Sequence, residues 1–236
     1  MPQSAEKRIG FVKRIFGDIA PRYDLLNHLM SAGQDMRWRK FAAEHLPDDT
    51  RMVLDVACGT GDMSLAVIRR RPEVNVGGLD FVMEMVSLAR AKSARAGVSS
   101  RIQHVVGDAM CLPFDDDRFD AAIVAFGFRN MPERARALGE MRRVVRSGGR
   151  VMVLEMTLPR NMKMIRFFKW YLRNVIPLLG GLISRNRGAY KYLPDSIEDF
   201  LKPDELIACF ERVGLQSVMA FPLTPGITYL HQGIVP

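Results

Sequence analysis

Acidic residues and glycines follow short apolar segments in the first half of the chain. The segment Val53–Asp62 (VLDVACGTGD) contains Asp55 and ends in a glycine-rich turn that begins at Gly59. Glycines in such a turn let a ligand approach the backbone closely. Asp80 closes the next apolar segment, 21 residues after Gly59, where a carboxylate can accept hydrogen bonds from the hydroxyls of a ribose. These residues predict a nucleotide-like ligand, although a lone glycine pair with a helix-capping aspartate also suits a purely structural turn.

Apolar segments alternate with helical patterns from Arg51 onward, which predicts an α/β fold. Strands are expected at Arg51–Cys58, Val74–Asp80, Ile102–Asp108, Phe119–Phe126 and Arg150–Met156, with helices at Met63–Arg71, Val82–Ala96, Pro132–Arg146 and Pro203–Val213. Ser147-Gly148-Gly149 is expected to end the third of these helices. Ligands of such sheets bind at the carboxyl ends of the strands, and the residues described above fall at or near those ends.

The flanking segments complete one expected domain of 236 residues. Residues 1–50 are expected to form a helical lid, residues 51–156 the ligand-binding core, and residues 157–200 a basic helical insertion on the substrate side. Residues 201–236 are expected to form a terminal helix and an antiparallel hairpin.

The residues of the turn indicate which ligand it holds. Asp62 follows the second glycine, and Ser64 stands where a dinucleotide-binding turn has its third glycine. A carboxylate at this place repels a pyrophosphate, so the turn favours a positively charged ligand that carries no phosphate. S-adenosylmethionine has a ribose, an amino-acid end and a sulfonium, and it fits this description without being the only cofactor that does.

The runs DVACGTGD, LD at Asp80 and GDAMCLPF (Gly107–Phe114) closely resemble class I S-adenosylmethionine-dependent methyltransferases. The resemblance implies a Rossmann-like seven-stranded sheet, mostly parallel, with an antiparallel C-terminal strand and helices on both faces. It also implies that the glycine turn holds the amino-acid end, Asp80 the ribose, and Asp108 with Ala109 the adenine, while Asp55 orients the glycine loop. The implied cofactor-binding set is Asp55, Gly59, Thr60, Gly61, Asp80, Phe81, Asp108, Ala109, Ala125 and Phe126.

Two further motifs indicate the methyl acceptor. Tyr23–Arg39 (YDLLNHLMSAGQDMRWR) and Phe126–Asn130 (FGFRN) together resemble the UbiE/MenG/COQ5 family of ubiquinone and menaquinone C-methyltransferases. The resemblance extends from about Phe16 to His231-Gln232-Gly233. It implies a reduced polyprenyl quinol as acceptor, either demethylmenaquinol, a 2-polyprenyl-6-methoxy-1,4-benzoquinol, or both.

The chain departs from the frequent family pattern at four places. Cys58 stands where the family often has glycine, and Ala125 where it often has a serine whose hydroxyl could bond the cofactor. Near the C-terminus, Pro225 replaces a frequent glycine and Gln232 a frequent arginine. The first two changes are expected to alter cofactor affinity modestly.

Methylation of a ring carbon needs an electron-rich ring, and a quinol becomes one when a phenol proton is removed. Because a phenol has a pKa near 10, the site must supply a base or stabilise a phenolate. Arg129 and Asn130 are the first candidates to contact the quinol oxygens. Arg129 would stabilise the phenolate or hold a proton-accepting water, or it would instead pair with a carboxylate that fixes its loop. Asp62 is a candidate proton acceptor or anchor for Arg129.

The remaining candidates belong to the two ends of the chain. Tyr23, Asp24 and Asn27 are expected to form part of the lid over the substrate, and His231 either reaches the site or is structural. No metal site is predicted, because the three cysteines are far apart and there are only four histidines. The cysteine usage predicts a reducing cytoplasm.

The net charge of +8 belongs to one segment. No acidic residue lies between Glu155 and Asp195, whereas eight basic residues do. Within it, Met164–Ile176 has helical periodicity, with basic residues (Lys163, Arg166, Lys169 and Arg173) on one side and large apolar residues on the other. Such a helix either packs on the core or binds a polyprenyl tail and an anionic membrane surface, for which residues 160–191 are the candidate.

Three other functions remain as alternatives. The first is a class I methyltransferase of another small hydrophobic phenol or lipid. The second is a nucleic-acid methyltransferase, which the interleaved aliphatic residues of the basic segment disfavour, so no nucleic-acid partner is predicted. The third is a scaffold without activity, which the intact Gly59–Asp62 and Phe126–Asn130 disfavour. A homodimer and a peripheral position at the inner face of the cell membrane are left open.

Overall fold

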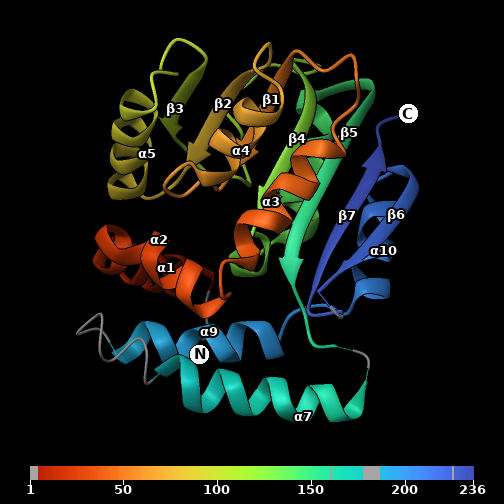
Figure 1. Ribbon diagram of the computed structural model, residues 1–236. Coiled ribbons are helices and arrows are strands. Elements are labelled where there is room, and N and C mark those ends of the chain that lie inside the picture. The colour runs from red at the N-terminus through yellow and green to blue at the C-terminus, as the bar shows by residue number, and fades with distance from the viewer. Residues whose placement is uncertain (1–4, 160, 178–186, 225) are drawn as a thin grey trace.

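Seven strands form one twisted sheet in the computed structural model, which describes residues 5–159, 161–177, 187–224 and 226–236. Their order is β3 (Ile102–Val106), β2 (Asn75–Asp80), β1 (Met52–Val56), β4 (Phe119–Ala125), β5 (Val145–Met156), β7 (Thr228–Ile234) and β6 (Gln216–Leu223) (Figure 1). β1 to β5 are parallel, while β7 is antiparallel to both of its neighbours. This is the sheet expected of a class I methyltransferase.

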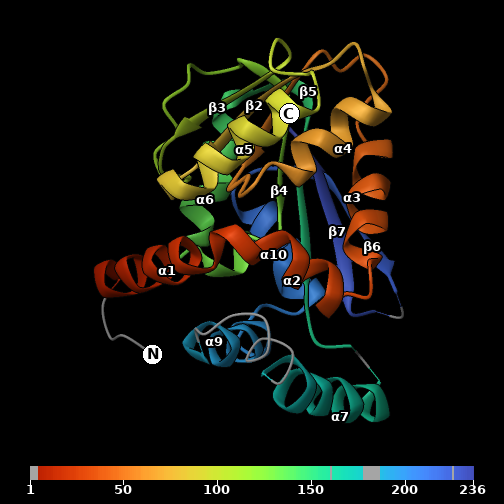
Figure 2. The ribbon, with the colours of Figure 1, turned by 60° about the vertical axis from the view of Figure 1, so that its left-hand side comes forward.

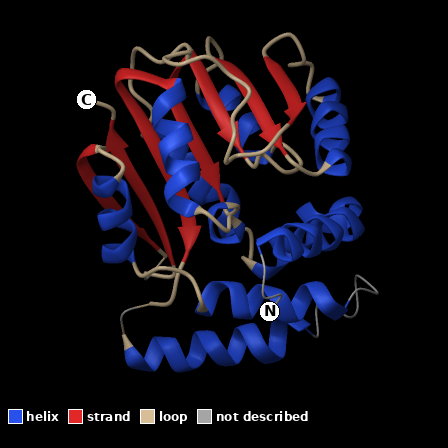
Figure 3. Ribbon diagram, turned by 180° about the vertical axis from the view of Figure 1, so that it is seen from behind, coloured by secondary structure: helices blue, strands red, loops and turns tan. Residues whose placement is uncertain are grey.

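Helices cover both faces of the sheet, as expected. One face carries α3 (Gln34–Glu44) and α4 (Asp62–Arg70), with α5 (Met83–Arg95) beside α4 (Figure 2). The opposite face carries α6 (Arg134–Val144) and α10 (Pro203–Arg212) (Figure 3). The apolar layer on the side of α3 and α4 contains Ala42, Val67 and Met152. The layer on the side of α6 and α10 contains Leu138, Met141 and Phe210. All six residues are fully buried.

A separate layer of helices lies across the carboxyl ends of the strands (Figures 1 and 2). It consists of α1 (Ala5–Ile19), η1 (Ala20–Arg22), α2 (Tyr23–Met30), α7 (Met162–Trp170), the π-helical turn η3 (Tyr171–Val175) and α9 (Arg187–Glu198). A third apolar cluster joins these helices, with Val12, Leu26, Leu172 and Ile197 among its buried members. The N-terminal segment and the segment after β5 therefore pack into one lid.

One element boundary differs clearly from the sequence-based expectation. α6 ends at Val144 and β5 begins at once with Val145, so the glycine pair after Ser147 lies inside the strand and does not end the helix. The pairing of β4 with β5 shifts register here, from Phe119 opposite Val145 to Ala121 opposite Arg150. β5 therefore has extra residues at a bulge, and glycines suit the irregular backbone of a bulge within a strand. The apolar run of residues 178–183 lies outside the described residues.

The glycine turn after β1 packs against a buried histidine. His104 of β3 is 4% exposed, and burial lowers the pKa of its imidazole to about 4. A Cβ on Gly78 of β2 would come within 2.5 Å of the His104 ring, and a Cβ on Gly61 within 3.2 Å. Close backbone packing against a neutral imidazole therefore holds the turn in place.

We expect Gly78→Ala to lower the free energy of unfolding by about 1–3 kcal/mol, because the added methyl group overpacks against the His104 ring. Gly139→Ala is the matched control: Gly139 lies in α6 with no atom within 4 Å of its would-be Cβ. The control should raise stability by about 0.5–1 kcal/mol, since alanine favours the helix. Urea denaturation measures both. A Gly78→Ala variant as stable as the parent would contradict the packing argument.

Candidate active site

Three cavities meet at the carboxyl ends of the strands. The core cavity, of about 280 Å³, is lined by residues that include Ala57, Gly59, Asp80, Phe81, Asp108, Ala109, Ala125, Phe126 and Asn130. The lid cavity, of about 310 Å³, is lined by residues that include Tyr23, Leu26, Asn27, Trp38, Arg39, Phe126, Arg129, Met156, Phe168, Tyr171 and Tyr192. The turn pocket, of about 20 Å³, is lined by residues that include Tyr23, Arg39, Asp55, Gly59, Thr60 and Asp62. Most of the residues predicted for the site therefore lie together.

The carboxylates of the core cavity are held by backbone amides. Asp80, at the end of β2, accepts hydrogen bonds from the N–H groups of Gly59 and Val82, both at 2.9 Å. Asp108 accepts one from the N–H of Met110 at 2.9 Å. Burial raises the pKa of Asp80, while these amide contacts oppose the rise. Each oxygen of Asp80 keeps a second lone pair that a ribose hydroxyl could use.

Asp55 connects the end of β1 to the helix that follows the glycine turn. Its Oδ2 accepts a hydrogen bond from the Ser64 hydroxyl at 2.6 Å. This contact across the turn is the one that an orienting role requires. Its Oδ1 is buried without a partner among the described residues, and burial raises the pKa of Asp55 to about 7.

A shared wall separates the core cavity from the lid cavity. Tyr23 and Phe126 line both cavities, and burial raises the pKa of the Tyr23 hydroxyl. Phe126 has a φ of 63°, a left-handed conformation that costs energy for a residue with a side chain. Its ring is held by Trp38, at 5.9 Å between ring centroids, and by the Arg39 guanidinium at 5.0 Å. The strained backbone thus directs an aromatic ring between the two cavities.

Arg129 of the FGFRN motif is paired with a carboxylate. Its Nη1 lies 2.6 Å from Oε1 of Glu155 and donates to the Phe126 carbonyl at 2.7 Å. Its Nε donates to the Ser196 hydroxyl at 3.3 Å, which links the pair to α9. Arg129 still lines the lid cavity, so the pairing and a contact with substrate are compatible. Its anchor, however, is Glu155 and not Asp62.

Asn130, the next residue, faces the other cavity. It lines the core cavity, and its Oδ1 accepts a hydrogen bond from the Tyr192 hydroxyl at 2.9 Å. Tyr192 belongs to α9 and lines the lid cavity. The motif therefore places one polar side chain on each side of the shared wall.

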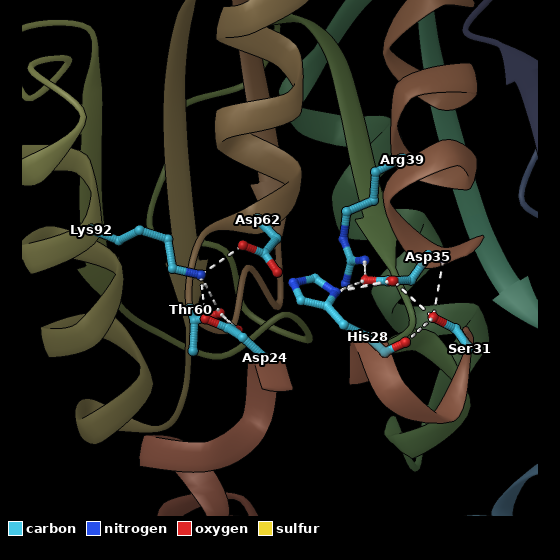
Figure 4. A network of polar contacts seen from close by, with 8 residues as sticks. All are labelled: Asp24, His28, Ser31, Asp35, Arg39, Thr60, Asp62 and Lys92. Carbon is cyan, nitrogen blue, oxygen red and sulfur yellow. Dashed lines mark hydrogen bonds and ion pairs between the residues drawn. The ribbon is translucent and has the colours of Figure 1, made fainter. Parts of the chain in front are cut away.

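Asp62 and Asp24 are joined by a lysine that the sequence analysis did not single out (Figure 4). Lys92 of α5 lies 2.6 Å from Asp62 and 2.5 Å from Asp24, and Thr60 donates to Asp24 at 2.5 Å. Asp62 lines the turn pocket but not the lid cavity, and its charge is compensated by Lys92. Asp62 thus belongs to an ion-pair network that ties α2 to the glycine turn, whereas its expected role as a proton acceptor stays a prediction.

A second polar network joins α2 to α3 (Figure 4). Asp35 contacts His28 at 2.8 Å, Arg39 at 2.6 Å and the Ser31 hydroxyl at 2.8 Å. Coordinating atoms of His28, Asp35 and Asp62 lie within 4.8 Å of one another, as metal ligands would. Because Arg39 and Lys92 already neutralise the two carboxylates, the cluster is satisfied by the protein itself.

His231 lies away from the three cavities. It is 2% exposed in β7, its Nε2 donates to the Pro203 carbonyl of α10 at 3.2 Å, and burial lowers its pKa to about 4. These contacts support a structural role for His231. Conversely, Lys92, Glu155 and Arg39 were missed as site residues. Glu155 carried a signal, a charge within an otherwise apolar strand, whereas Lys92 carried none.

Comparison with known proteins places this chain in a family. Residues 1–235 match the ubiE/COQ5 methyltransferase family. The chain belongs to this family. It is 44% identical, over 94% of its length and 100% of the relative's, to a protein of Thermus thermophilus named demethylmenaquinone methyltransferase. It is 41% identical, over 94% of its length and 87% of the relative's, to a ubiquinone/menaquinone biosynthesis C-methyltransferase UbiE of Geobacter sulfurreducens.

Solved structures confirm the fold of this ubiE/COQ5 chain. A SAM-dependent methyltransferase of Thermotoga maritima superposes with a TM-score of 0.65 at 18% identity, covering 94% of this chain and 99% of that one. A methyltransferase of Methanococcus maripaludis gives a TM-score of 0.66 at 18% identity, covering 91% of each chain. The predicted family and fold class are thereby confirmed, and the family implies S-adenosylmethionine as the co-substrate.

Lys92→Met should loosen the lid, because Asp24 and Asp62 would be left near each other without a cation. We expect faster amide hydrogen exchange in α2 and a loss of stability of about 1–2 kcal/mol, a modest value because the three side chains are partly exposed. Arg95→Met, an exposed change in the same helix, is the control. Unchanged exchange in α2 of the Lys92 variant would show that the network does not hold the lid.

Proposed function

We propose that this chain transfers the methyl group of S-adenosylmethionine to a ring carbon of a reduced polyprenyl quinol, demethylmenaquinol, a 2-polyprenyl-6-methoxy-1,4-benzoquinol, or both. Family membership supports the reaction class. The observation that carries the choice of acceptor is the apolar lid cavity, which shares the wall of Tyr23 and Phe126 with the core cavity. Two cavities that share a wall bring a donor and an acceptor within reach of each other.

The core cavity and the turn pocket suit S-adenosylmethionine, which supplies a methyl group on a positively charged sulfur. Asp80 has free lone pairs for a ribose diol, and Asp108 and Ala109 line the same core cavity. The unpartnered Oδ1 of Asp55 suits a cationic group near the glycine turn. Carboxylates at these places also disfavour a phosphate-bearing cofactor.

The lid cavity suits an aromatic ring with two hydroxyl groups and an isoprenoid tail. Its walls are mostly aliphatic and aromatic, while Arg129, Asn27 and Tyr23 provide polar groups near the shared wall. We assign to Arg129 the stabilisation of the quinol phenolate, because a buried, paired guanidinium keeps its charge. The ring carbon gains the methyl group as the carbon–sulfur bond breaks, and the ring proton then leaves to restore aromaticity.

Methyl transfer from isotope-labelled S-adenosylmethionine to a short-tailed demethylmenaquinol tests this function. Label should enter the ring only when a reductant keeps the acceptor as quinol, since the quinone ring is electron-poor. The same assay with a benzoquinol and with an unrelated hydrophobic phenol distinguishes the alternative acceptors. Transfer that is equal without reductant, or that is specific for the unrelated phenol, would overturn the proposal.

The role of Arg129 is tested with a paired substitution. Removing Arg129 alone would leave Glu155 buried and unpaired, at a cost of about 3–5 kcal/mol. Arg129→Met with Glu155→Gln removes both charges and should retain cofactor binding while lowering turnover at least 100-fold. Arg136→Met, at an exposed position of α6, is the control. Full turnover of the double variant would remove Arg129 from the mechanism.

We further propose that α7 faces an anionic membrane, from which the tail enters the lid cavity. Phe167 lines this cavity and is nevertheless 67% exposed, and it stacks on Trp170, which is 55% exposed. Phe167 was expected on the packed side of the helix, but it lies on the outer side with exposed Lys163 and Arg166. Exposed aromatic and basic residues on one stripe are typical of helices that bind membrane interfaces.

Two of the basic residues form ion pairs within the protein, which limits the expected contribution of charge to membrane binding. Lys169 and Arg173 both pair with Glu198 of α9, at 2.8 and 3.0 Å. Arg160 and Arg185 lie outside the described residues. Among the described helices, none is long and apolar enough to cross a bilayer. Lys163 and Arg166 are therefore the expected lipid contacts of α7.

Sedimentation with vesicles tests the membrane contact. Binding should require anionic lipid, weaken with salt, and fall at least 10-fold in a Phe167→Ser, Trp170→Ser variant, because the exposed pair then no longer enters the interface. Met83→Ser, at a residue of α5 that is 53% exposed, is the control for general loss of surface hydrophobicity. Equal binding of the two variants, or equal recovery with neutral vesicles, would contradict a role for α7.

A further inference from the structure

A buried arginine of α3 has most of its hydrogen-bonding capacity unused. Arg39 of α3 is 5% exposed, and its Nη1 donates to Asp35 at 2.6 Å. Its Nε is buried without a partner among the described residues. The side chain lines the turn pocket and also the lid cavity. A guanidinium offers five N–H groups, so an arginine bound on one side only suits a further anion.

The turn pocket also contains an unused carboxylate oxygen. Asp55 is 1% exposed, and its Oδ1 has no partner among the described residues. Asp55 and Arg39 line the same pocket, yet no ion pair within 4.0 Å joins them among the described contacts. The other acid of the pocket, Asp62, already pairs with Lys92, which it shares with Asp24. Buried polar atoms without partners are costly, so a ligand that satisfies both would be bound strongly.

The complement of this pocket is a small group that carries a negative and a positive charge on neighbouring atoms, namely an α-amino acid. We propose that Arg39 binds the carboxylate of the donor's amino-acid end through its unused guanidinium face, while Asp55 faces the ammonium. This assignment rests on the proposed function, in which S-adenosylmethionine is the donor. It makes α3 part of the donor site, which would otherwise be built by the segments that follow the strands.

The contacts of Arg39 connect donor binding to the acceptor side. Its position depends on Asp35, which His28 and Ser31 also hold. Its guanidinium lies 5.0 Å from the ring of Phe126, in the wall between the cavities. A donor with an amino-acid end therefore fixes one wall of the lid cavity, and a nucleoside that lacks this end leaves that wall without its anchor.

Calorimetric titration of two nucleosides tests the assignment without any turnover. S-adenosylhomocysteine has the amino-acid end, and 5′-methylthioadenosine lacks it while sharing the adenosine. Arg39→Gln should raise the Kd of S-adenosylhomocysteine about 10- to 100-fold, the range for lost charged hydrogen bonds, and leave that of 5′-methylthioadenosine within about twofold. Arg37→Gln, at an exposed position of the same helix, should change neither.

A second substitution guards against a folding defect, since Arg39→Gln leaves Asp35 with less charge compensation. Arg39→Gln with Asp35→Asn removes both charges of the ion pair and should give the same selective loss. Equal weakening of the two nucleosides would assign Arg39 to the fold, and unchanged affinities would show that it does not touch the donor. Either result would overturn the inference. If neither nucleoside binds the unmodified protein, it is the donor assignment of the proposed function that fails.

Discussion

Ion pairs at the carboxyl ends of the strands join the lid to the sheet. Glu155 of β5 pairs with Arg129, which reaches α9 through Ser196. Lys92 of α5 joins the lid residue Asp24 to the glycine turn. Breaking such a pair leaves an uncompensated charge, so each contact makes the position of a lid helix depend on the core. The cavities exist because these helices are held in this position.

The division between the cavities follows from the end of β4. Phe126 takes a left-handed backbone conformation directly after the strand, and its ring is then held by Trp38 and Arg39 of α3. The same loop sends Arg129 into the lid cavity and Asn130 into the core cavity. One short segment thus contributes to both sides of the site.

The lid differs from the core in what stabilises it. The core helices pack on a sheet, whereas α1, α2, α7 and α9 pack mainly on one another through a smaller apolar cluster. α7 also leaves Met162, Phe167 and Trp170 largely exposed. A layer with few contacts to the sheet and an apolar outer stripe is suited to opening for a hydrophobic substrate, because less buried surface is lost when it moves.

The sequence by itself determined the order of strands and helices, the glycine turn, the carboxylates at the strand ends and the family. These follow from local patterns, because the periodicity of apolar residues and the residue types of a turn depend on consecutive residues. Tertiary structure alone decided which charges meet. Lys92 lies 68 residues from Asp24, and Arg129 lies 26 residues from Glu155. No local pattern encodes such pairs, since they form only when separate elements pack.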